Sequence, residues 1–366
     1  MTTGSTMHPP EVDTAIFLGA GASKAEGAPL QGRLFTDYFS SSLFKKRKDQ
    51  MNQELATFFL EMFQINVRQR SLTNVTFPTF EEVLGLTDLA ILRKEGFRGF
   101  DSDNQTAKGG RLRFIAQHLV FLVAKVLDLK LQREKGLHRK LVEALREAKR
   151  LHSTVFVSTN YDILIDNALS EELDHGTDLD YGVDFRNFDR PGDWTRPVLD
   201  RSVRLFKPHG SLNWLFCPTC NELDLTPNEK GVVTRLSIST FRDKTCDVCR
   251  GVYVPLIVPP TFYKDMTNAF LSAIWNRADI TLRKVKHIVF CGYSFPDADT
   301  HIKYLLKRAQ TNRDGSLKVT VINHYRGKKA KEKEDEKARY QRFLGRDVEY
   351  TKLSFEKFAA NPMKVI

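Results

Sequence analysis

Short apolar runs alternate with amphipathic stretches along most of the chain. Six runs are rich in β-branched or aromatic residues and have the length of buried strands: 15–18, 154–158, 203–206, 255–258, 287–291 and 318–322. Helical candidates lie between several of them. This alternation predicts an α/β fold, in which a Rossmann-like parallel sheet is covered by helices on both faces.

The stretch after the first run, about residues 33–152, is expected to be a helical insertion. Apolar residues recur at helical spacing in two parts of it: Leu119, Leu122, Val123, Val126 and Leu127, then Leu137, Leu141, Leu145, Ala148 and Leu151. Thr79 and Glu82 have the spacing of a capping box, which marks a helix start. The glycine-rich segment 96–110 is expected to be a loop.

The order of these patterns also predicts the domain organisation. We expect residues 1–13 to form a flexible N-terminus and residues 14–325 to form one large domain. Lys and Glu alternate at helical spacing over 328–342, which predicts a solvated helix. This helix belongs to a helical C-terminal segment, 326–366.

A turn of small residues leaves the first apolar run: Gly19, Ala20, Gly21, Ala22 and Ser23. Glycines in a strand-to-helix turn let backbone N–H groups approach a phosphate without interference from a Cβ atom. The usual dinucleotide fingerprint has a third glycine where this chain has Lys24. The turn predicts a phosphate site, with a tight structural turn as the alternative.

Polar or small residues directly follow the later apolar runs as well. They are Thr159 and Asn160, His209 and Gly210, Gly292 with Tyr293 and Ser294, and Asn323. Open α/β sheets bind ligands at the carboxyl ends of their strands. We therefore expect these positions to converge.

Four of the five cysteines form two CxxC pairs, Cys217 with Cys220 and Cys246 with Cys249. Paired knuckles of this kind are typical of tetrahedral zinc sites. Four protein ligands leave no open position for water. The sequence therefore predicts a structural Zn²⁺ in a small module, about residues 215–252.

The composition is that of an ordinary globular protein, with 366 residues and a hydrophobic fraction of 41%. No apolar stretch has the length of a membrane span, and the N-terminus lacks a signal-peptide core, so we expect a cytoplasmic protein. The formal net charge of +11 fits a nucleotide or nucleic-acid partner. It fits an unspecialised basic surface equally well.

Taken in order, these motifs resemble those of the sirtuin-like NAD-binding superfamily. The resemblance spans about residues 14–325 and rests on 19–23, 158–162 (STNYD), 208–210 (PHG), the two cysteine pairs, 292–294 (GYS) and 321–323 (VIN). Within the superfamily, segments 159–162 and 292–297 are most similar to the bacterial sirtuin-like NADases of anti-phage defence. The resemblance implies NAD⁺ as the ligand. The 19–23 turn would hold the pyrophosphate, and Gly292, Ser294 and Asn323 would line the adenosine ribose.

Three polar residues are implied in the reaction. Asn160 would orient a water or a ribose hydroxyl, and Asp162 would hold the nicotinamide carboxamide. His209 would be the general base, because an imidazole takes up a proton near neutral pH. Each has a structural alternative: Asn160 and Asp162 at the start of a helix near Tyr161, and His209 in a plain turn.

Two departures from the sirtuin deacylases bear on the reaction. Segment 27–33 replaces the one that carries the arginine and phenylalanine shielding the nicotinamide ribose in deacylases, so no residue here is given that role. Segment 258–264 stands where deacylases have an element of the peptide groove. Water is therefore the expected acceptor. The expected activity is that of an NAD⁺ glycohydrolase, which releases ADP-ribose and nicotinamide.

The likeness to defence proteins implies depletion of NAD⁺ in an infected bacterial cell. It also implies a homo-oligomer and a separate activating protein, such as a ring-shaped DNA-translocating ATPase or an Argonaute-type protein. Two other classes stay open: an NAD-dependent protein deacylase, and a non-enzymatic module that binds NAD, ADP-ribose or nucleic acid. A need for an acylated peptide marks the first, and salt-dependent DNA binding without NAD⁺ turnover marks the second.

Overall fold

The computed structural model describes residues 11–45, 50–102, 110–131, 135–173, 179–187, 194–195, 197, 201–226, 245–258, 268–325, 327 and 329–366. Several predicted features lie partly outside these residues. Among them are 1–10 of the N-terminus, 103–109 of the 96–110 loop, 227–244 of the cysteine module and 259–264 of the segment that replaces the peptide groove.

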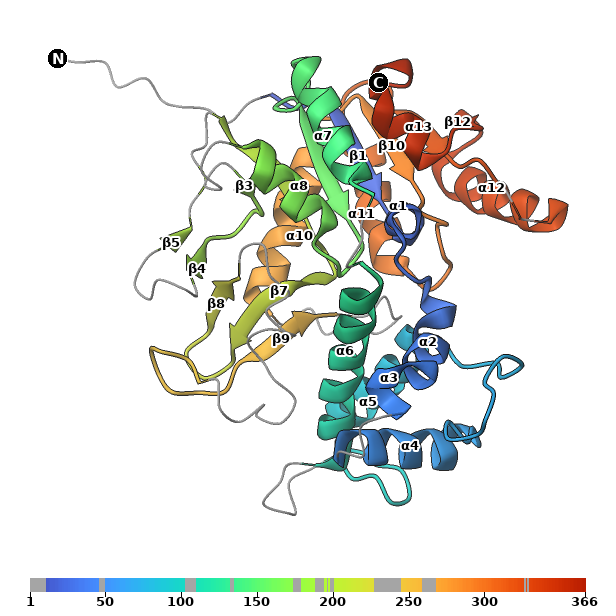
Figure 1. Cartoon of the computed structure of the whole chain (residues 1–366). Coiled ribbons are helices and arrows are strands. Elements are labelled where there is room, and N and C mark those ends of the chain that lie inside the picture. The colour runs from blue at the N-terminus through green and yellow to red at the C-terminus, as the bar shows by residue number, and fades with distance from the viewer. Residues whose placement is uncertain are drawn as a thin grey trace.

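Seven parallel strands form the central sheet, in the order β12-β11-β10-β1-β2-β6-β3 (Figure 1). They are β1 (Thr14–Leu18), β2 (Thr154–Ser158), β3 (Leu179–Asp180), β6 (Val203–Phe206), β10 (His287–Cys291), β11 (Lys318–Ile322) and β12 (Val348–Thr351). Every residue of β1, β2 and β10 is buried, as in a sheet covered on both faces. The strand order reverses beside β1, as in doubly wound nucleotide-binding folds. The predicted Rossmann-like sheet is confirmed.

Two groups of helices cover opposite faces of the sheet (Figure 1). One group is α1 (Ala20–Glu26), α7 (Leu137–Glu147), α8 (Leu164–Glu172) and α13 (Phe355–Ala360), and the other is α10 (Ala269–Leu282), α11 (Thr300–Thr311) and α12 (Ala330–Leu344). Helix α7 falls within the expected insertion 33–152, but its apolar residues pack in the core of the sheet.

A second core lies below the sheet in Figure 1. It is built by the helical lobe, which comprises η1 (Gln31–Arg33), α2 (Leu34–Ser40), α3 (Ser42–Lys45), α4 (Gln50–Phe63), α5 (Phe80–Arg93) and α6 (Arg111–Lys130). Rings of Phe35, Phe39, Phe59 and Phe77 pack here with centroids 4.8–6.3 Å apart. The predicted capping box is confirmed at the start of α5. There the N–H of Glu82 donates to Thr79 Oγ1 (3.2 Å), and the N–H of Thr79 donates to Glu82 Oε2 (2.7 Å).

A second, mostly antiparallel sheet packs beside the helical lobe, in the order β5-β4-β8-β7-β9. This cysteine sheet comprises β4 (Phe185–Asn187), β5 (Trp194–Thr195), β7 (Gly210–Cys217), β8 (Glu222–Leu225) and β9 (Val254–Ile257). The prediction that 255–258 belongs to the parallel sheet is wrong, because β9 pairs antiparallel with β7. A four-residue apolar run fits either sheet, so its pattern does not specify the partner. Leu212, Leu215 and Tyr253 join the core of the helical lobe.

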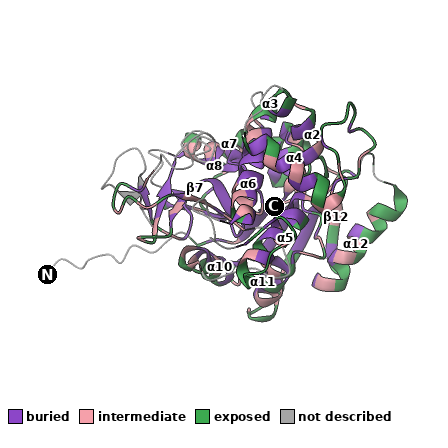
Figure 2. Ribbon diagram, turned by 90° about the horizontal axis from the view of Figure 1, so that it is seen from below, coloured by how far each residue is buried: buried purple, intermediate pink, exposed green. Residues whose placement is uncertain are grey.

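The C-terminal segment contains a strand as well as helices. Strand β12 pairs with β11 and extends the parallel sheet. The expected solvated helix is α12, whose surface is largely exposed while Glu336, Tyr340 and Leu344 are buried (Figure 2). Helix α13 returns to pack on α7.

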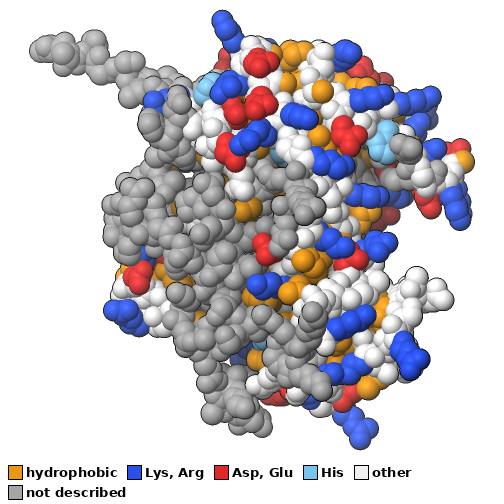
Figure 3. All heavy atoms as spheres, viewed as in Figure 1, with side chains coloured by type: hydrophobic (Ala, Val, Ile, Leu, Met, Phe, Trp, Pro, Cys, Tyr) orange, Lys and Arg blue, Asp and Glu red, His pale blue; other side chains and the backbone are white. Residues whose placement is uncertain are grey.

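The outer surface is mixed in charge. On the face seen in Figure 3, Lys and Arg side chains are interleaved with Asp and Glu over the described part of the surface. None of the helices formed by the described residues is long and apolar enough to span a bilayer.

Glu26, at the end of α1, holds the start of α7. Its carboxylate accepts hydrogen bonds from the backbone N–H groups of Lys135, Leu137 and His138 at 2.6–2.9 Å. Burial alone raises the pKa of Glu26. Hydrogen bonds from the side chain and backbone of His138 and from Lys135 outweigh burial and lower that pKa below its usual 4.5. The carboxylate thus pairs N–H groups that a helix start leaves unsatisfied.

We expect Glu26→Ala to lower the free energy of unfolding at pH 7 by about 2–3 kcal/mol, because buried N–H groups lose their acceptor. Because the folded-state pKa is lowered, this stabilisation is present above about pH 4.5 and is lost as the pH falls below it. Urea unfolding at pH 7 and pH 4 measures both effects. The exposed Glu147 provides a control, since Glu147→Ala should cost less than about 0.5 kcal/mol. Equal losses from the two variants would contradict the capping role.

Candidate functional site

The turns that follow β1 and β10 are in direct backbone contact. The N–H of Gly19 donates to the carbonyl of Cys291 (3.0 Å), and the N–H of Gly21 donates to that of Gly292 (2.8 Å). A Cβ on Gly19 would lie 2.6 Å from Cα of Tyr293, and one on Gly21 would lie 2.7 Å from Cα of Gly292. No side chain fits at either position. The glycines therefore permit a close approach at the point where the strand order reverses, which we call the turn–turn contact.

The turn–turn contact uses amides that were expected to bind a pyrophosphate. Gly19 and Gly21 donate across the contact, and the N–H of Ala22 donates to the carbonyl of Gly19 (2.9 Å). The structure thus contains the tight turn that the sequence offered as the alternative. A phosphate-binding role for 19–23 stays a prediction.

Ser23, Asn160 and Asp162 are joined by short side-chain hydrogen bonds. Asn160 Nδ2 donates to Ser23 Oγ (2.8 Å) and to the carbonyl of Gly19 (3.0 Å), and Ser23 Oγ donates to Asp162 Oδ2 (2.7 Å). All three side chains are buried. They come from the carboxyl ends of the neighbouring strands β1 and β2, where convergence was expected.

The position where α8 begins tests the structural alternative, in which Asn160 and Asp162 support the start of this helix. Helix α8 begins at Leu164 rather than near Tyr161, and the N–H of Leu164 donates to Asp162 Oδ1 (3.2 Å). Asp162 therefore supports the helix start as well as binding Ser23. Asn160 does not cap this helix, because the residue at the cap position is Ile163. The amide of Asn160 donates to the segment after β1 instead.

His209 follows β6 in a tight turn, closed by a hydrogen bond from the N–H of Gly210 to the carbonyl of Lys207 (3.0 Å). Gly210 has a φ of +81°, which favours glycine. The buried His209 ring places Nε2 3.3 Å from Oδ2 of Asp299, and the same oxygen accepts a hydrogen bond from the hydroxyl of Tyr293 (2.9 Å). A carboxylate beside an imidazole favours the protonated ring. The arrangement suits a group that takes up a proton.

Lys207 ties the His209 turn to the segment after β2. Its side chain is fully buried, and Nζ donates to the carbonyl of Asp162 (2.6 Å), Asp166 Oδ2 (2.9 Å) and Ser211 Oγ (2.6 Å). Three acceptors satisfy the three N–H groups of the ammonium. Because β2 and β6 are paired, this network fixes His209 relative to Asp162.

Two predicted ribose-lining residues contact helix α12 instead of the turn–turn contact. The guanidinium of Arg339 donates to the carbonyl of Ser294 (3.1 and 3.2 Å), and Asn323 Nδ2 donates to Glu336 Oε1 (2.7 Å). Within the described part of the chain, no hydrogen bond joins Ser294 or Asn323 to the 19–23 turn. Their role at a ribose stays a prediction, whereas Gly292 lies in the contact itself.

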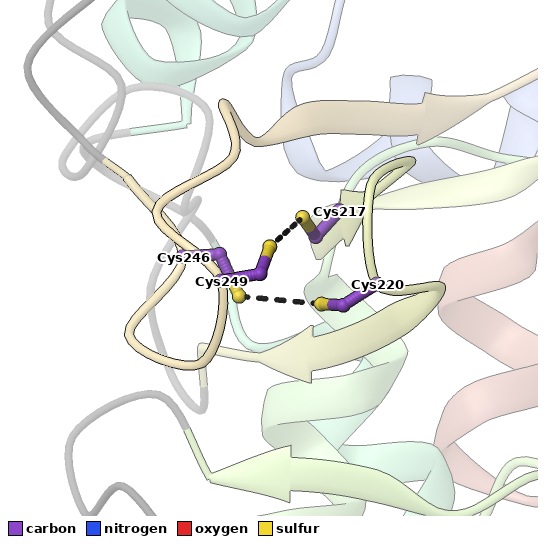
Figure 4. Close-up of side chains that lie close together, drawn as sticks. All are labelled: Cys217, Cys220, Cys246 and Cys249. Atoms are coloured by element: carbon purple, nitrogen blue, oxygen red, sulfur yellow. Dashed lines mark hydrogen bonds between the residues drawn. The ribbon is translucent and has the colours of Figure 1, made fainter.

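The four paired cysteines meet at one end of the cysteine sheet (Figure 4). Their Sγ atoms all lie within 4.8 Å of one another, with 3.5 Å between Cys217 and Cys249 and 3.5 Å between Cys220 and Cys246. Thiolates at about 2.3 Å from one tetrahedral zinc would lie about 3.8 Å apart. Each CxxC turn ends on a residue with φ near +60°, Asn221 (60°) and Arg250 (62°). The cluster could hold a zinc ion.

The sequence analysis missed three polar residues in this region: Lys207, Asp299 and Glu81. Asp299 follows β10 in the same connection as Gly292. The rule that ligands bind at the carboxyl ends of parallel strands, here the strand-end rule, could have found it. Lys207 directly follows β6 and precedes His209 by two positions, so the same rule applies. Glu81 lies inside the capping box of α5, where a helix start already explains an acidic residue. Nothing in the sequence indicates that it is buried.

Residues 154–343, just over half of the chain, match the SIR2-like domain family. The match begins at β2 and ends in α12, so it includes Asn160 and His209 but not the 19–23 turn. No curated protein matches the chain in sequence.

Similar solved structures share little sequence with this chain. A Sir2 complex with a p53 peptide and NAD⁺ is 13% identical, with a TM-score of 0.43, and the alignment covers 96% of this chain and 92% of that one. Sir2Tm bound to a propionylated peptide is 13% identical, with a TM-score of 0.42 and coverages of 96% and 92%. A Sir2 homologue in complex with ADP ribose is 14% identical, with a TM-score of 0.40 and coverages of 95% and 88%.

The turn–turn contact can be tested by adding a single methyl group. We expect Gly292→Ala to lower the free energy of unfolding by at least about 2 kcal/mol, from steric overlap added to backbone strain. Gly292 has a φ of +64°, and its Cβ would lie 2.3 Å from the backbone nitrogen of Ala22. Gly315 has a φ of +80° with nothing within 4 Å of its Cβ, so Gly315→Ala measures the strain alone. Chemical unfolding of both variants gives the difference. Similar losses would mean that the close approach contributes nothing.

Proposed function

Because the chain belongs to the SIR2-like domain family, we propose that it binds NAD⁺ and hydrolyses the bond between nicotinamide and ribose. The observation that carries this proposal is the gathering of Ser23, Asn160, Asp162 and His209 at adjoining strand ends, next to the turn–turn contact. Nucleotides bind doubly wound sheets in the crevice at such a reversal of strand order.

In the proposed reaction, nicotinamide leaves with the electron pair of the glycosidic bond, and C1′ of the ribose gains oxocarbenium-like charge. Water attacks C1′ and gives its proton to His209. Asp299 stabilises the imidazolium that forms, since its Oδ2 lies 3.3 Å from Nε2. The net change converts NAD⁺ and water into ADP-ribose, nicotinamide and a proton.

Asn160 and Asp162 act by position in this proposal. Asn160 Nδ2 is committed to Gly19 and Ser23, so Oδ1 is the atom that would accept a hydrogen bond from a water or a ribose hydroxyl. Asp162 accepts hydrogen bonds from Ser23 and Leu164. A carboxylate has about four acceptor positions, so Asp162 retains capacity for the nicotinamide carboxamide.

The proposed setting is anti-phage defence in the bacterial cytoplasm. Its support is the likeness of segments 159–162 and 292–297 to defence NADases. Hydrolysis of NAD⁺ would starve an infected cell, so the activity needs control. A homo-oligomer and a separate activating protein, such as a ring-shaped ATPase or an Argonaute-type protein, would supply that control.

The proposal assigns a structural Zn²⁺ to Cys217, Cys220, Cys246 and Cys249. Four thiolates complete a tetrahedral coordination sphere, so the metal would stabilise the fold without touching the substrate. Cys217 and Cys246 belong to the apolar core that the cysteine sheet shares with the helical lobe. Loss of the metal should therefore destabilise both the cysteine sheet and the helical lobe.

We expect Cys246→Ser to lose the zinc and to lower the melting temperature by several degrees, because closed thiolate sites contribute folding energy directly. Elemental analysis and thermal unfolding of the purified variant measure the two effects. Cys291 lies in the core of the central sheet, so Cys291→Ala is a control that should retain one zinc per chain. Wild-type protein that folds with normal stability and no zinc would contradict the assignment.

The reaction is tested by product analysis with and without an acetylated peptide. We expect wild-type protein to form ADP-ribose and nicotinamide in the absence of peptide. His209→Ala should lower kcat by about 10²–10⁴-fold, the usual contribution of a general base. The exposed His152 is the matched control, and His152→Ala should leave turnover unchanged. Acetyl-ADP-ribose formed only with peptide would indicate a deacylase. Unchanged turnover in His209→Ala would remove His209 from the mechanism.

A further inference from the structure

Helix α5 connects the helical lobe to the segments that carry the candidate site. Its first residue, Phe80, packs its ring edge to face on Tyr161, with 6.2 Å between centroids. The hydroxyl of Tyr161 donates to the carbonyl of Val258 (3.4 Å), and the N–H of Val258 donates to the carbonyl of His209 (2.9 Å). The next residue of the helix, Glu81, is therefore held at the boundary between the lobe and the site.

The carboxyl group of Glu81 is buried without a hydrogen bond. The residue is 7% exposed, and neither carboxyl oxygen has a hydrogen-bond partner among the described residues. Folded proteins pair nearly all buried polar groups, because an unpaired one loses its hydration without compensation. An exception next to a candidate site is typical of a group whose partner is the ligand.

The surroundings of Glu81 are negatively charged. Burial raises the pKa of Glu81 to about 8; its own backbone N–H acts against this shift, and the charges of Asp299 and Glu82 add to it. Asp88, two turns further along α5, is exposed and adds a further acidic group to this helix. Burial, then Glu81, Asp299 and Asp88, raise the pKa of Tyr161 well above 10.

Three basic groups on the elements next to α5 are engaged elsewhere. From η1, Arg33 lies 3.4 Å from Asp37, and from α6, Arg111 lies 2.7 Å from Glu54. His118, also on α6, has Nδ1 2.5 Å from the carbonyl of Phe114. None of these contacts involves Glu81, and no ion pair joins it to a cation within the described part of the chain.

We propose that Glu81 is a ligand-facing residue of this site, and that its carboxylate pairs with the positive charge of the nicotinamide ring of NAD⁺. This proposal rests on the proposed function. NADH has the same nucleotide framework without the ring charge, so it isolates the interaction. Glu81 should therefore favour the binding of NAD⁺ over NADH.

The pairing makes NAD⁺ binding depend on pH. With a pKa of about 8, the free Glu81 carboxyl holds a proton at pH 7. A bound cation favours the carboxylate, so binding releases that proton. The affinity for NAD⁺ should increase as the pH rises from 6 to 8 and then level off, whereas the affinity for NADH should change little.

Equilibrium binding of carba-NAD⁺ and NADH at pH 6, 7 and 8 tests the proposal. Carba-NAD⁺ keeps the ring charge, and a cyclopentane in place of the ribose prevents cleavage. We expect wild type to prefer carba-NAD⁺ by about tenfold or more, one pKa unit of coupling. Glu81→Gln should reduce that preference to about threefold or less and remove its pH dependence. Glu95→Gln changes an exposed carboxylate just after α5 and should behave as wild type.

Thermal unfolding separates this role from a structural one. Because the pKa of Glu81 is raised, its ionisation destabilises the fold as the pH rises from about 4.5 to 8. Glu81→Gln should therefore maintain or raise the melting temperature at pH 8, whereas loss of a structural residue would lower it. If wild type binds carba-NAD⁺ and Glu81→Gln keeps the same preference over NADH, the proposed function stands and this inference is wrong. If wild type binds neither nucleotide, both are overturned.

Discussion

The turn–turn contact determines where the groups on both sides of it lie. On one side, Gly19 and Gly21 begin helix α1, which presents Ser23 to Asn160 and Asp162. On the other side, Gly292 begins the connection that carries Asp299 to His209. A side chain at any of the three glycines would force the two turns apart. The same displacement would then separate the two halves of the site, because each half is anchored to one of the turns.

Two buried ionisable residues near the site, Lys207 and Glu81, differ in whether their polar atoms have hydrogen-bond partners. Lys207 has an acceptor for each of its N–H groups, so its charge is compensated and it works as a rigid connection between β2 and β6. Glu81 has no such compensation from the residues that the structure describes, and the negative charge of Asp299 acts on it. A satisfied network stabilises one geometry, whereas an unsatisfied group gains a partner only when something binds. The first is a structural element and the second is a property expected of a binding site.

The central sheet could be predicted from the sequence because its strands are continuous apolar runs. Asn160 and His209 could be placed at the carboxyl ends of two of these strands, β2 and β6, which are neighbours in the sheet. The sheet to which β9 belongs could not be predicted, because a run of four apolar residues does not indicate which strand it pairs with. The edge strand β12 has a mixed pattern of buried and exposed residues, so its sequence did not indicate a strand. The burial of Glu81 could not be predicted from the sequence. It results from packing between the helical lobe and the segments that carry the site, and no local sequence pattern indicates such packing.

Strand β7 connects the cysteine cluster to the candidate site. It is eight residues long, begins at Gly210 directly after His209, and ends at Cys217. Along its length, Leu212 and Leu215 pack in the core that also holds α5. The position of His209 therefore depends on the same layer of structure that positions Glu81. A metal bound by the cysteines would therefore fix the far end of the strand that follows His209.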